Sequence, residues 1–205
     1  MRTAVLPNCQ TGMGSSNFYI QFGISNRIAN LIIGPSYRKH CKTAGKRNLS
    51  RRSKTGSRPK VPVLFDESYQ FEIGKGVVLK DGADVTLVAT GIMVSKAMEA
   101  AEALAADGIS AAVVNISTIK PLDQQLIIEM AQKTGAMVTC EEHNIYGGLG
   151  SAVAEVLVEH CPVPMARVGV EDSFGESGLP DQLLEKYGLT AANIADKAKA
   201  VIGRK

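Results

Sequence analysis

The chain has 205 residues, of which 45% are hydrophobic and 21% are charged. This is ordinary globular usage, so composition excludes a chain that is disordered throughout. The formal net charge of +3 is divided unevenly: residues 1–60 contain 12 Lys and Arg and no acid, while residues 61–205 contain the other 11 basic residues and all 20 acids, a net charge of −9.

Residues 1–60 are predicted to be a basic segment that is disordered or aberrant. Hydrophobic periodicity is poor there, and only Ile28 to Ile33 forms a short apolar run, so the segment cannot bury enough surface to offset its ordering entropy. Four interpretations are open: a frame or gene-model error, a basic and acid-poor transit peptide, a basic arm for nucleic acid, or a solvated tail without a role. The tail outranks the transit peptide and the arm, so nucleic acid is not a favoured partner.

Residues 61–74 are predicted to be a linker and residues 75–205 a folded domain. The domain begins with a short strand from Gly76 to Leu79, followed by a turn that contains the hairpin signal Asp81-Gly82. The continuous apolar run from Val85 to Ala89 indicates a central strand. We therefore expect the first strand to pair antiparallel with the second at an edge of the sheet.

Helices and strands alternate along the rest of the domain. The expected elements are a helix over 95–107, a strand over 111–116, a helix started by Pro121 and Asp123 and stopped by Gly135, a strand over 136–141, a helix over 148–159, a strand over 165–170, and helices over 181–187 and 190–201, the last with Thr190 as N-cap. Such alternation produces right-handed crossovers between parallel strands. The predicted fold is therefore α/β with three layers: a mostly parallel sheet with one antiparallel edge strand, and helices on both faces.

Polar and glycine-rich residues follow the strands of this predicted sheet. Ligands of such sheets bind at the carboxyl ends of the strands. Those ends carry Thr90-Gly91, Ser117-Thr118, Glu141 to Gly148 and Glu171 to Gly178. We expect any function to lie at this edge.

The richest of these ends is the segment from Glu141 to Ser151. A strand, a glycine turn and a helix start leave the first N–H groups of the helix pointing outward, which favours anions. The candidate residues for an interface, a loop contact or an anion site are Glu141, Glu142, His143, Asn144, Gly147, Gly148, Gly150 and Ser151.

This segment does not by itself indicate catalysis. Neighbours on an extended strand point to opposite faces, so Glu141 and Glu142 are not a facing acid–base pair. No motif places a Ser or Cys nucleophile. A helix-capping role or a contact with a partner subunit is the better interpretation. Gly148 is expected to need the positive φ that β-branched residues avoid.

Several ordered motifs carry a resemblance to a known family. They are Gly76 to Gly82, Asp84 to Gly91, Ile119 to Asp123, Glu141 to Val153, Arg167 to Val170 and Phe174 to Gly178. In this order, over about residues 58–203, they resemble the C-terminal (third) domain of transketolase and of its relative deoxyxylulose-phosphate synthase. The resemblance implies a five-stranded mixed sheet with helices on both faces.

Enzymes of that family use thiamine diphosphate and Mg²⁺, held by two other domains, and transfer a two-carbon ketol unit between sugar phosphates in the pentose phosphate pathway. The resemblance implies that this domain supplies scaffold and dimer contacts. It also implies thiamine-binding domains or a subunit as partner, in a homo- or hetero-oligomer. The family's Gly-Asp-Gly metal motif has no match, since Lys80-Asp81-Gly82 and Ala106-Asp107-Gly108 both lack the first glycine. We therefore expect no cofactor binding and no activity by the chain alone.

The alternative is a non-catalytic α/β module that binds a small anion or nucleotide at the glycine turn 147–151. Gly148-Leu149-Gly150 opens a helix after a strand, as a dinucleotide fingerprint does. Val153, however, stands where the third glycine of that fingerprint would allow close helix–strand packing.

Other sequence features favour a cytoplasmic location. The four cysteines form no CxxC pair, so a zinc site is not expected. No sustained apolar core of a secretory signal and no apolar run of membrane length is visible.

Overall fold

The computed structural model describes residues 62–66 and 68–205, so the predicted basic segment lies outside the described residues. The strands are β1 (Gly76–Lys80), β2 (Val85–Ala89), β3 (Ala111–Ile116), β4 (Met137–Asn144) and β5 (Met165–Val170). The helices are α3 (Met93–Ala106), α4 (Gln124–Thr134), α5 (Leu149–His160), α6 (Pro180–Lys186) and α7 (Ala191–Ile202). Each strand and helix expected from the sequence is therefore present, close to its expected bounds.

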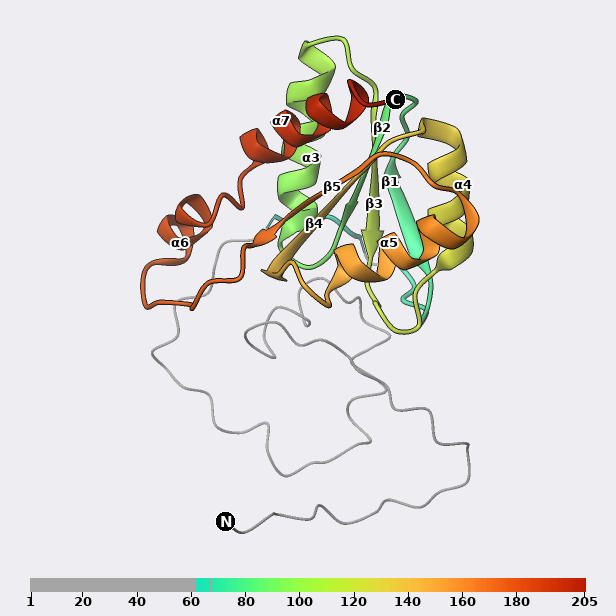
Figure 1. Cartoon of the computed structure of the whole chain (residues 1–205). Helices are drawn as coiled ribbons and strands as arrows, with labels where there is room; N and C mark the ends of the chain where they lie inside the picture. The colour runs from blue at the N-terminus through green and yellow to red at the C-terminus, as the bar shows by residue number, and fades with distance from the viewer. Residues whose placement is uncertain (1–61, 67) are drawn as a thin grey trace, which may run out of the picture.

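The strands form one five-stranded sheet in the order β1-β3-β2-β4-β5. β1 pairs antiparallel with β3, and all other neighbours pair parallel. Helices α3 and α7 pack together on one face, and α4 and α5 cover the other (Figure 1). The predicted three-layer α/β fold with one antiparallel edge strand is confirmed.

The expected hairpin between β1 and β2 is wrong, because β3 lies between them. The connection instead crosses the beginning of β3: the N–H groups of Ala83 and Asp84 donate to the carbonyl of Ser110 at 3.0 and 2.8 Å. A carboxylate oxygen of Asp84 accepts the Ser110 N–H at 2.7 Å. Gly82 passes so close that a Cβ on it would lie 2.3 Å from the carbonyl carbon of Ala111. The Asp81-Gly82 pair therefore lies where the chain passes over the start of β3, and it does not form a hairpin turn.

Two apolar clusters fill the space on either side of the sheet. The cluster beneath α3 and α7 includes Leu87, Leu104 and Ile194, and the cluster beneath α4 and α5 includes Ile127 and Val153. All five side chains are fully buried, and each such aliphatic side chain stabilises a fold by about 1.5–3 kcal/mol. Every residue of β2 is buried, as expected for the central strand between these clusters.

Side chains cap two helices where the sequence predicts it. Asp123 accepts the Leu126 N–H before α4 at 3.3 Å, and Thr190 accepts the Asn193 N–H before α7 at 3.2 Å. Gly135 ends α4 with a φ of 64°, a conformation that glycine adopts without strain. Within residues 62–66 and 68–205, no helix is long and apolar enough to cross a membrane.

We expect Gly82→Ala to lower the free energy of unfolding by about 2–3 kcal/mol, because the new methyl group meets backbone atoms that cannot rotate away. Gly175→Ala is the matched control, since a Cβ there would have nothing within 4 Å. Urea unfolding followed by circular dichroism measures both. Equal unfolding midpoints for the two variants would contradict the close crossing over β3.

Candidate functional site

Strand β4 extends further than the sequence predicts and carries the candidate residues past the edge of the regular sheet. It continues through Glu142 and His143 to Asn144, which pairs with Val170 after an irregularity in register that follows Cys140. The glycine turn and α5 come directly after it (Figure 1).

Glu141 lies within β4 and is only 1% exposed. One carboxylate oxygen accepts the Leu149 N–H at 2.8 Å, and the other accepts the Gly150 N–H at 2.9 Å. These donors belong to the first turn of α5, where N–H groups have no partner within the helix. A negative charge there also meets the positive end of the helix dipole. Glu141 therefore caps α5 from the neighbouring strand.

The place that the sequence marks as attractive to an anion is thus occupied by a carboxylate of the protein itself. The turn is closed further by Ser151, whose hydroxyl oxygen accepts the Gly147 N–H at 2.9 Å. Glu141, the glycine turn and Ser151 together form what we call the Glu141 clasp (residues 141 and 147–151).

Three glycines leave the space that this clasp needs. A Cβ on Gly148 would lie 1.9 Å from a carboxylate oxygen of Glu141. A Cβ on Gly150 would lie 2.8 Å from Cδ of Arg167, and one on Gly169 would lie 3.3 Å from Cγ of Glu141. A side chain at any of these positions would push on the buried carboxylate or on Arg167.

The expectation that Gly148 has a positive φ is wrong. Its φ is −98°, and the left-handed conformation belongs to Gly147, with a φ of 74°. Glycine is needed at position 148 because Glu141 fills the space beside it. At position 147 it is the backbone angle that favours glycine.

The loop before the turn is fixed by polar contacts with β5 and the segment after it. The side chain of Asn144 accepts the Tyr146 N–H at 2.8 Å and donates to Asp172 at 3.3 Å. Arg167 donates to the carbonyl of Ile145 at 3.0 Å, and its guanidinium carbon lies 5.5 Å from the centre of the Tyr146 ring. The Tyr146 side chain is 61% exposed, so this loop presents an aromatic ring to the surface.

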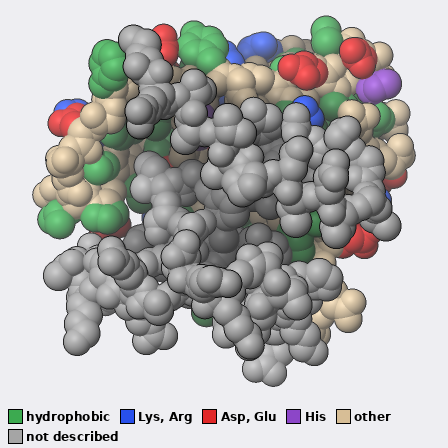
Figure 2. Space-filling view, turned by 90° about the horizontal axis from the view of Figure 1, so that it is seen from below, with side chains coloured by type: hydrophobic (Ala, Val, Ile, Leu, Met, Phe, Trp, Pro, Cys, Tyr) green, Lys and Arg blue, Asp and Glu red, His purple; other side chains and the backbone are tan. Residues whose placement is uncertain are grey.

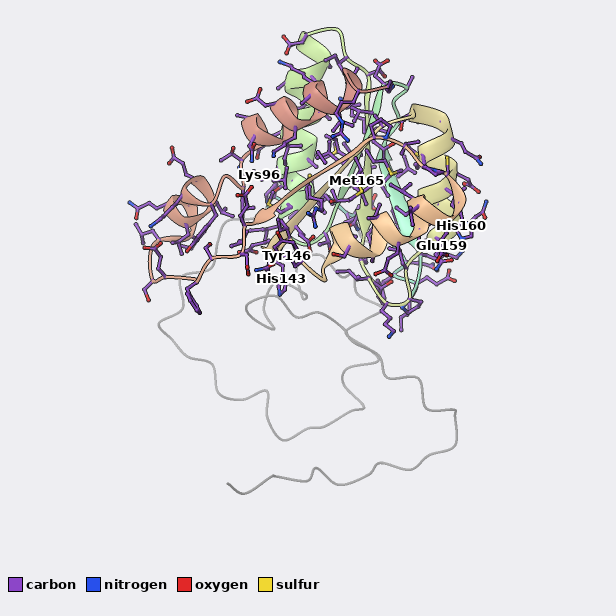
Figure 3. All side chains as sticks on the ribbon, in the orientation of Figure 1. Lys96, His143, Tyr146, Glu159, His160 and Met165 are labelled. Atoms are coloured by element: carbon purple, nitrogen blue, oxygen red, sulfur yellow. The ribbon has the colours of Figure 1, made fainter. Side chains whose placement is uncertain are left out.

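Glu142 and His143 lie beside the clasp and not within it. Glu142 is half-buried, and desolvation raises the pKa of its carboxyl group. His143 is exposed, with Nδ1 3.2 Å from the carbonyl of Asn144. Figure 3 shows His143 and Tyr146 near each other at the carboxyl end of β4. Cys140, the residue before Glu141 in β4, is fully buried. Burial together with the charge of Glu141 raises the pKa of its thiol, so the thiol stays protonated at neutral pH.

The structure therefore brings most of the predicted residues together in one place, where they bond mainly to each other. Within the residues that the structure describes, no group of three or more His, Cys, Asp or Glu side chains is placed to hold a metal ion. A shallow depression of about 260 Å³ lies at the opposite edge of the sheet, away from the clasp. It is lined by Lys80, Ala105, Gly108, Ile109, Ser110 and Ala111.

Sequence reasoning did not identify Arg167, Tyr146 or Thr139 as parts of this site. Arg167 is marked by being the single charged residue of β5, and that signal could have identified it. Thr139 is fully buried beside Gly150, and its hydroxyl group has no hydrogen-bond partner. A threonine in a buried strand is common, so no sequence signal marks it.

Comparison with known proteins gives a consistent result. A model of the transketolase C-terminal domain family matches residues 74–194. A 6-deoxy-6-sulfo-D-fructose transketolase subunit of Clostridium sp. (strain MSTE9) is 53% identical over 142 residues, which cover 69% of this chain and 44% of that protein. The 1-deoxy-D-xylulose-5-phosphate synthase of Heliobacterium modesticaldum is 48% identical over 139 residues, which cover 66% of this chain and 21% of the synthase.

A solved structure agrees with these relatives. A split gene transketolase, determined as an inactive beta4 tetramer, is 54% identical, with a TM-score of 0.68 over 70% of this chain and 47% of that one. The chain thus spans less than half the length of these three similar proteins. The resemblance read from the sequence motifs is confirmed.

Glu141→Gln tests the capping of α5. The glutamine keeps the shape of the side chain but turns an NH₂ group towards one of two backbone N–H groups. We expect the free energy of unfolding to fall by about 1.5–3 kcal/mol, the range for hydrogen bonds to charged groups. Glu155→Gln, the same change at an exposed position of α5, should stay within about 0.5 kcal/mol. Equal losses in urea unfolding would show that Glu141 does not cap the helix.

Glu142→Gln tests the desolvated carboxyl group through its dependence on pH. The folded-state pKa of Glu142 is raised above the usual value of 4.5, so the folded protein holds this proton more tightly than the unfolded chain. The stability contribution of Glu142 is therefore lost as pH rises above that value. Thermal melts should show the variant gaining stability relative to wild type between about pH 4 and pH 7. A difference that is constant with pH, or that shrinks, would contradict this.

Proposed function

Because the chain belongs to the transketolase C-terminal domain family, we propose that it is the C-terminal part of a transketolase-like thiamine diphosphate enzyme. In the complete assembly, that enzyme would transfer a two-carbon ketol unit between sugar phosphates. This chain would contribute scaffold and dimer contacts to it.

One observation carries this proposal. The family match covers residues 74–194, which include all five strands of the sheet, while the matched segment is only 44% of the Clostridium subunit and 21% of the synthase. We propose that the thiamine-binding domains correspond to the remainder of such proteins.

We propose that thiamine diphosphate and Mg²⁺ bind to these thiamine-binding domains, or to a partner subunit that carries them. The Clostridium relative is described as a subunit and the solved relative as a split gene product in a tetramer. Both descriptions support an assembly built from several chains, either a homo- or a hetero-oligomer.

We place the assembly in the cytoplasm and its reaction in the pentose phosphate pathway. Residues 75–205 would be the family domain and residues 61–74 the linker before it.

We assign the Glu141 clasp a structural part in that assembly. Its buried carboxylate holds the start of α5 against β4, and Asn144 and Arg167 fix the loop that exposes Tyr146. A rigid loop with an exposed aromatic ring suits a subunit contact, since aromatic residues are enriched at interface cores. His143 would stand beside this contact without transferring protons.

The clasp opposes the binding of a small anion or nucleotide at residues 147–151. Such a ligand would have to displace Glu141 from the N–H groups of Leu149 and Gly150. Two charge-assisted hydrogen bonds and the helix dipole oppose that displacement.

Isothermal titration calorimetry of the full chain tests the division of labour. We expect no binding of thiamine diphosphate with Mg²⁺ at micromolar concentrations, and no ketol transfer by the chain alone, because the residues that would hold the cofactor belong to the partner. Micromolar binding by this chain would contradict its role as a C-terminal part.

Reconstitution tests the same role with a positive result. The acceptor is the Heliobacterium modesticaldum synthase shortened by the segment that matches this chain. The preparation used is one whose activity returns when the removed synthase segment is added back as a separate chain. Adding this chain should restore part of the synthase activity, since 48% identity preserves most packing positions. Failure of this chain where the native segment succeeds would contradict the proposal.

A further inference from the structure

The segment after β5 projects from the body of the domain. We call residues 171–187, which include α6, the arm. In Figure 1 the arm and α6 extend away from the sheet beyond the end of β5. Every residue from 171 to 182 is exposed, and α6 buries no residue at all. The arm therefore gains little from packing on its own domain.

The arm displays apolar side chains on its outside. Phe174 is 100% exposed and Leu179 is 63% exposed. In Figure 2, hydrophobic side chains are visible at the surface on the side where α6 lies in Figure 1. A fully exposed phenylalanine gains no stabilisation from burial on its own domain, and burial against a partner would supply it.

The shape of the arm is nevertheless fixed by its own contacts. The Tyr187 hydroxyl lies 3.3 Å from the carbonyl of Phe174 and 3.4 Å from a carboxylate oxygen of Glu176. Lys186 forms an ion pair with Glu176. Leu184 and Tyr187 pack against the core beneath α3 and α7 and anchor the base of the arm. Because these contacts already order the arm, binding through Phe174 would lose less conformational entropy than binding through a flexible loop.

The charge of the arm indicates the chemistry of what it meets. It contains five carboxylates and one lysine. That lysine is paired with Glu176, and no ion pair within the described residues involves the other four, Glu171, Asp172, Asp181 and Glu185. A complementary surface would have an apolar pocket with Lys or Arg at its rim. A second copy of the folded part is a poorer fit, because residues 61–205 have a net charge of −9.

We propose that the arm is a docking element that inserts Phe174, supported by the exposed Leu179 of the same arm, into a basic-rimmed apolar pocket of the subunit that supplies the thiamine-binding domains. The inference rests on the proposed function for the identity of that partner. It adds the element that makes the contact, the anchoring side chain and the charge of the opposing surface. The carboxylates of the arm steer the partner during association, and the Phe174 ring supplies most of the affinity.

The test uses the full chain and the shortened Heliobacterium synthase described above. We compare the affinity of wild type, Phe174→Asp and Val158→Asp for that protein by biolayer interferometry. Val158 is the matched control, because it is 72% exposed but lies on α5. Phe174→Asp should weaken binding at least about tenfold, as loss of an aromatic anchor does. Val158→Asp should leave the affinity within about twofold, as expected for a surface position outside the interface.

A second measurement identifies the occupant directly. A photo-crosslinking phenylalanine analogue is placed at position 174, and the crosslinked peptides are identified by mass spectrometry. Crosslinks to the synthase support the inference. Crosslinks confined to a second copy, or to residues 1–60 of the same chain, would overturn it. The same holds if Phe174→Asp and wild type bind equally well. If the shortened synthase binds its own removed segment but not the wild-type chain, the proposed function is contradicted, and not the role of the arm.

Discussion

The contact between the Glu141 carboxylate and the first N–H groups of α5 is the interaction on which the carboxyl edge of the sheet depends. It satisfies two donors that the helix cannot satisfy itself, and it does so with a charge that the helix dipole favours. Burying a carboxylate is costly unless it is hydrogen-bonded. These backbone donors offset that cost, so the helix start and the strand end hold each other in place.

The residues around this contact follow from the need to leave room for it. Glycines stand at 148, 150 and 169 because a Cβ at each would meet Glu141, Arg167 or the loop before the turn. Arg167 then runs over Gly150 and reaches the carbonyl of Ile145. The buried carboxylate and Arg167 together account for the glycines at the turn, in α5 and in β5. Tyr146 takes its position from this rigid base, whereas the arm is anchored by Leu184 and Tyr187 on the core beneath α3 and α7.

Periodicity and capping chemistry are sufficient to predict the alternation of strands and helices, and with it the layers, and the caps at Asp123 and Thr190, because these signals lie within each element or next to it. The partner of β1 could not be predicted in this way. It depends on a crossing over Ser110, about thirty residues further along the chain, which the local Asp81-Gly82 signal does not contain. The clasp shows the same division. A helix start with free donors was visible at Gly148 to Ser151, but the identity of the acceptor, and therefore the reason for glycine at 148, required the packing of β4 against α5.

The order of the strands has a consequence for synthesis on the ribosome. Among the described strands, β2 pairs with β3 and β4, while β1 pairs with β3 alone. As the chain emerges, β1 and β2 leave the exit tunnel before residues 111–116, the strand with which both pair in the folded domain. The central apolar strand, Val85–Ala89, must then wait for β4 before its second edge is covered. Such non-local pairing slows folding and leaves an apolar edge open to wrong partners during translation. We therefore expect the nascent chain to depend on chaperones until β4 is complete.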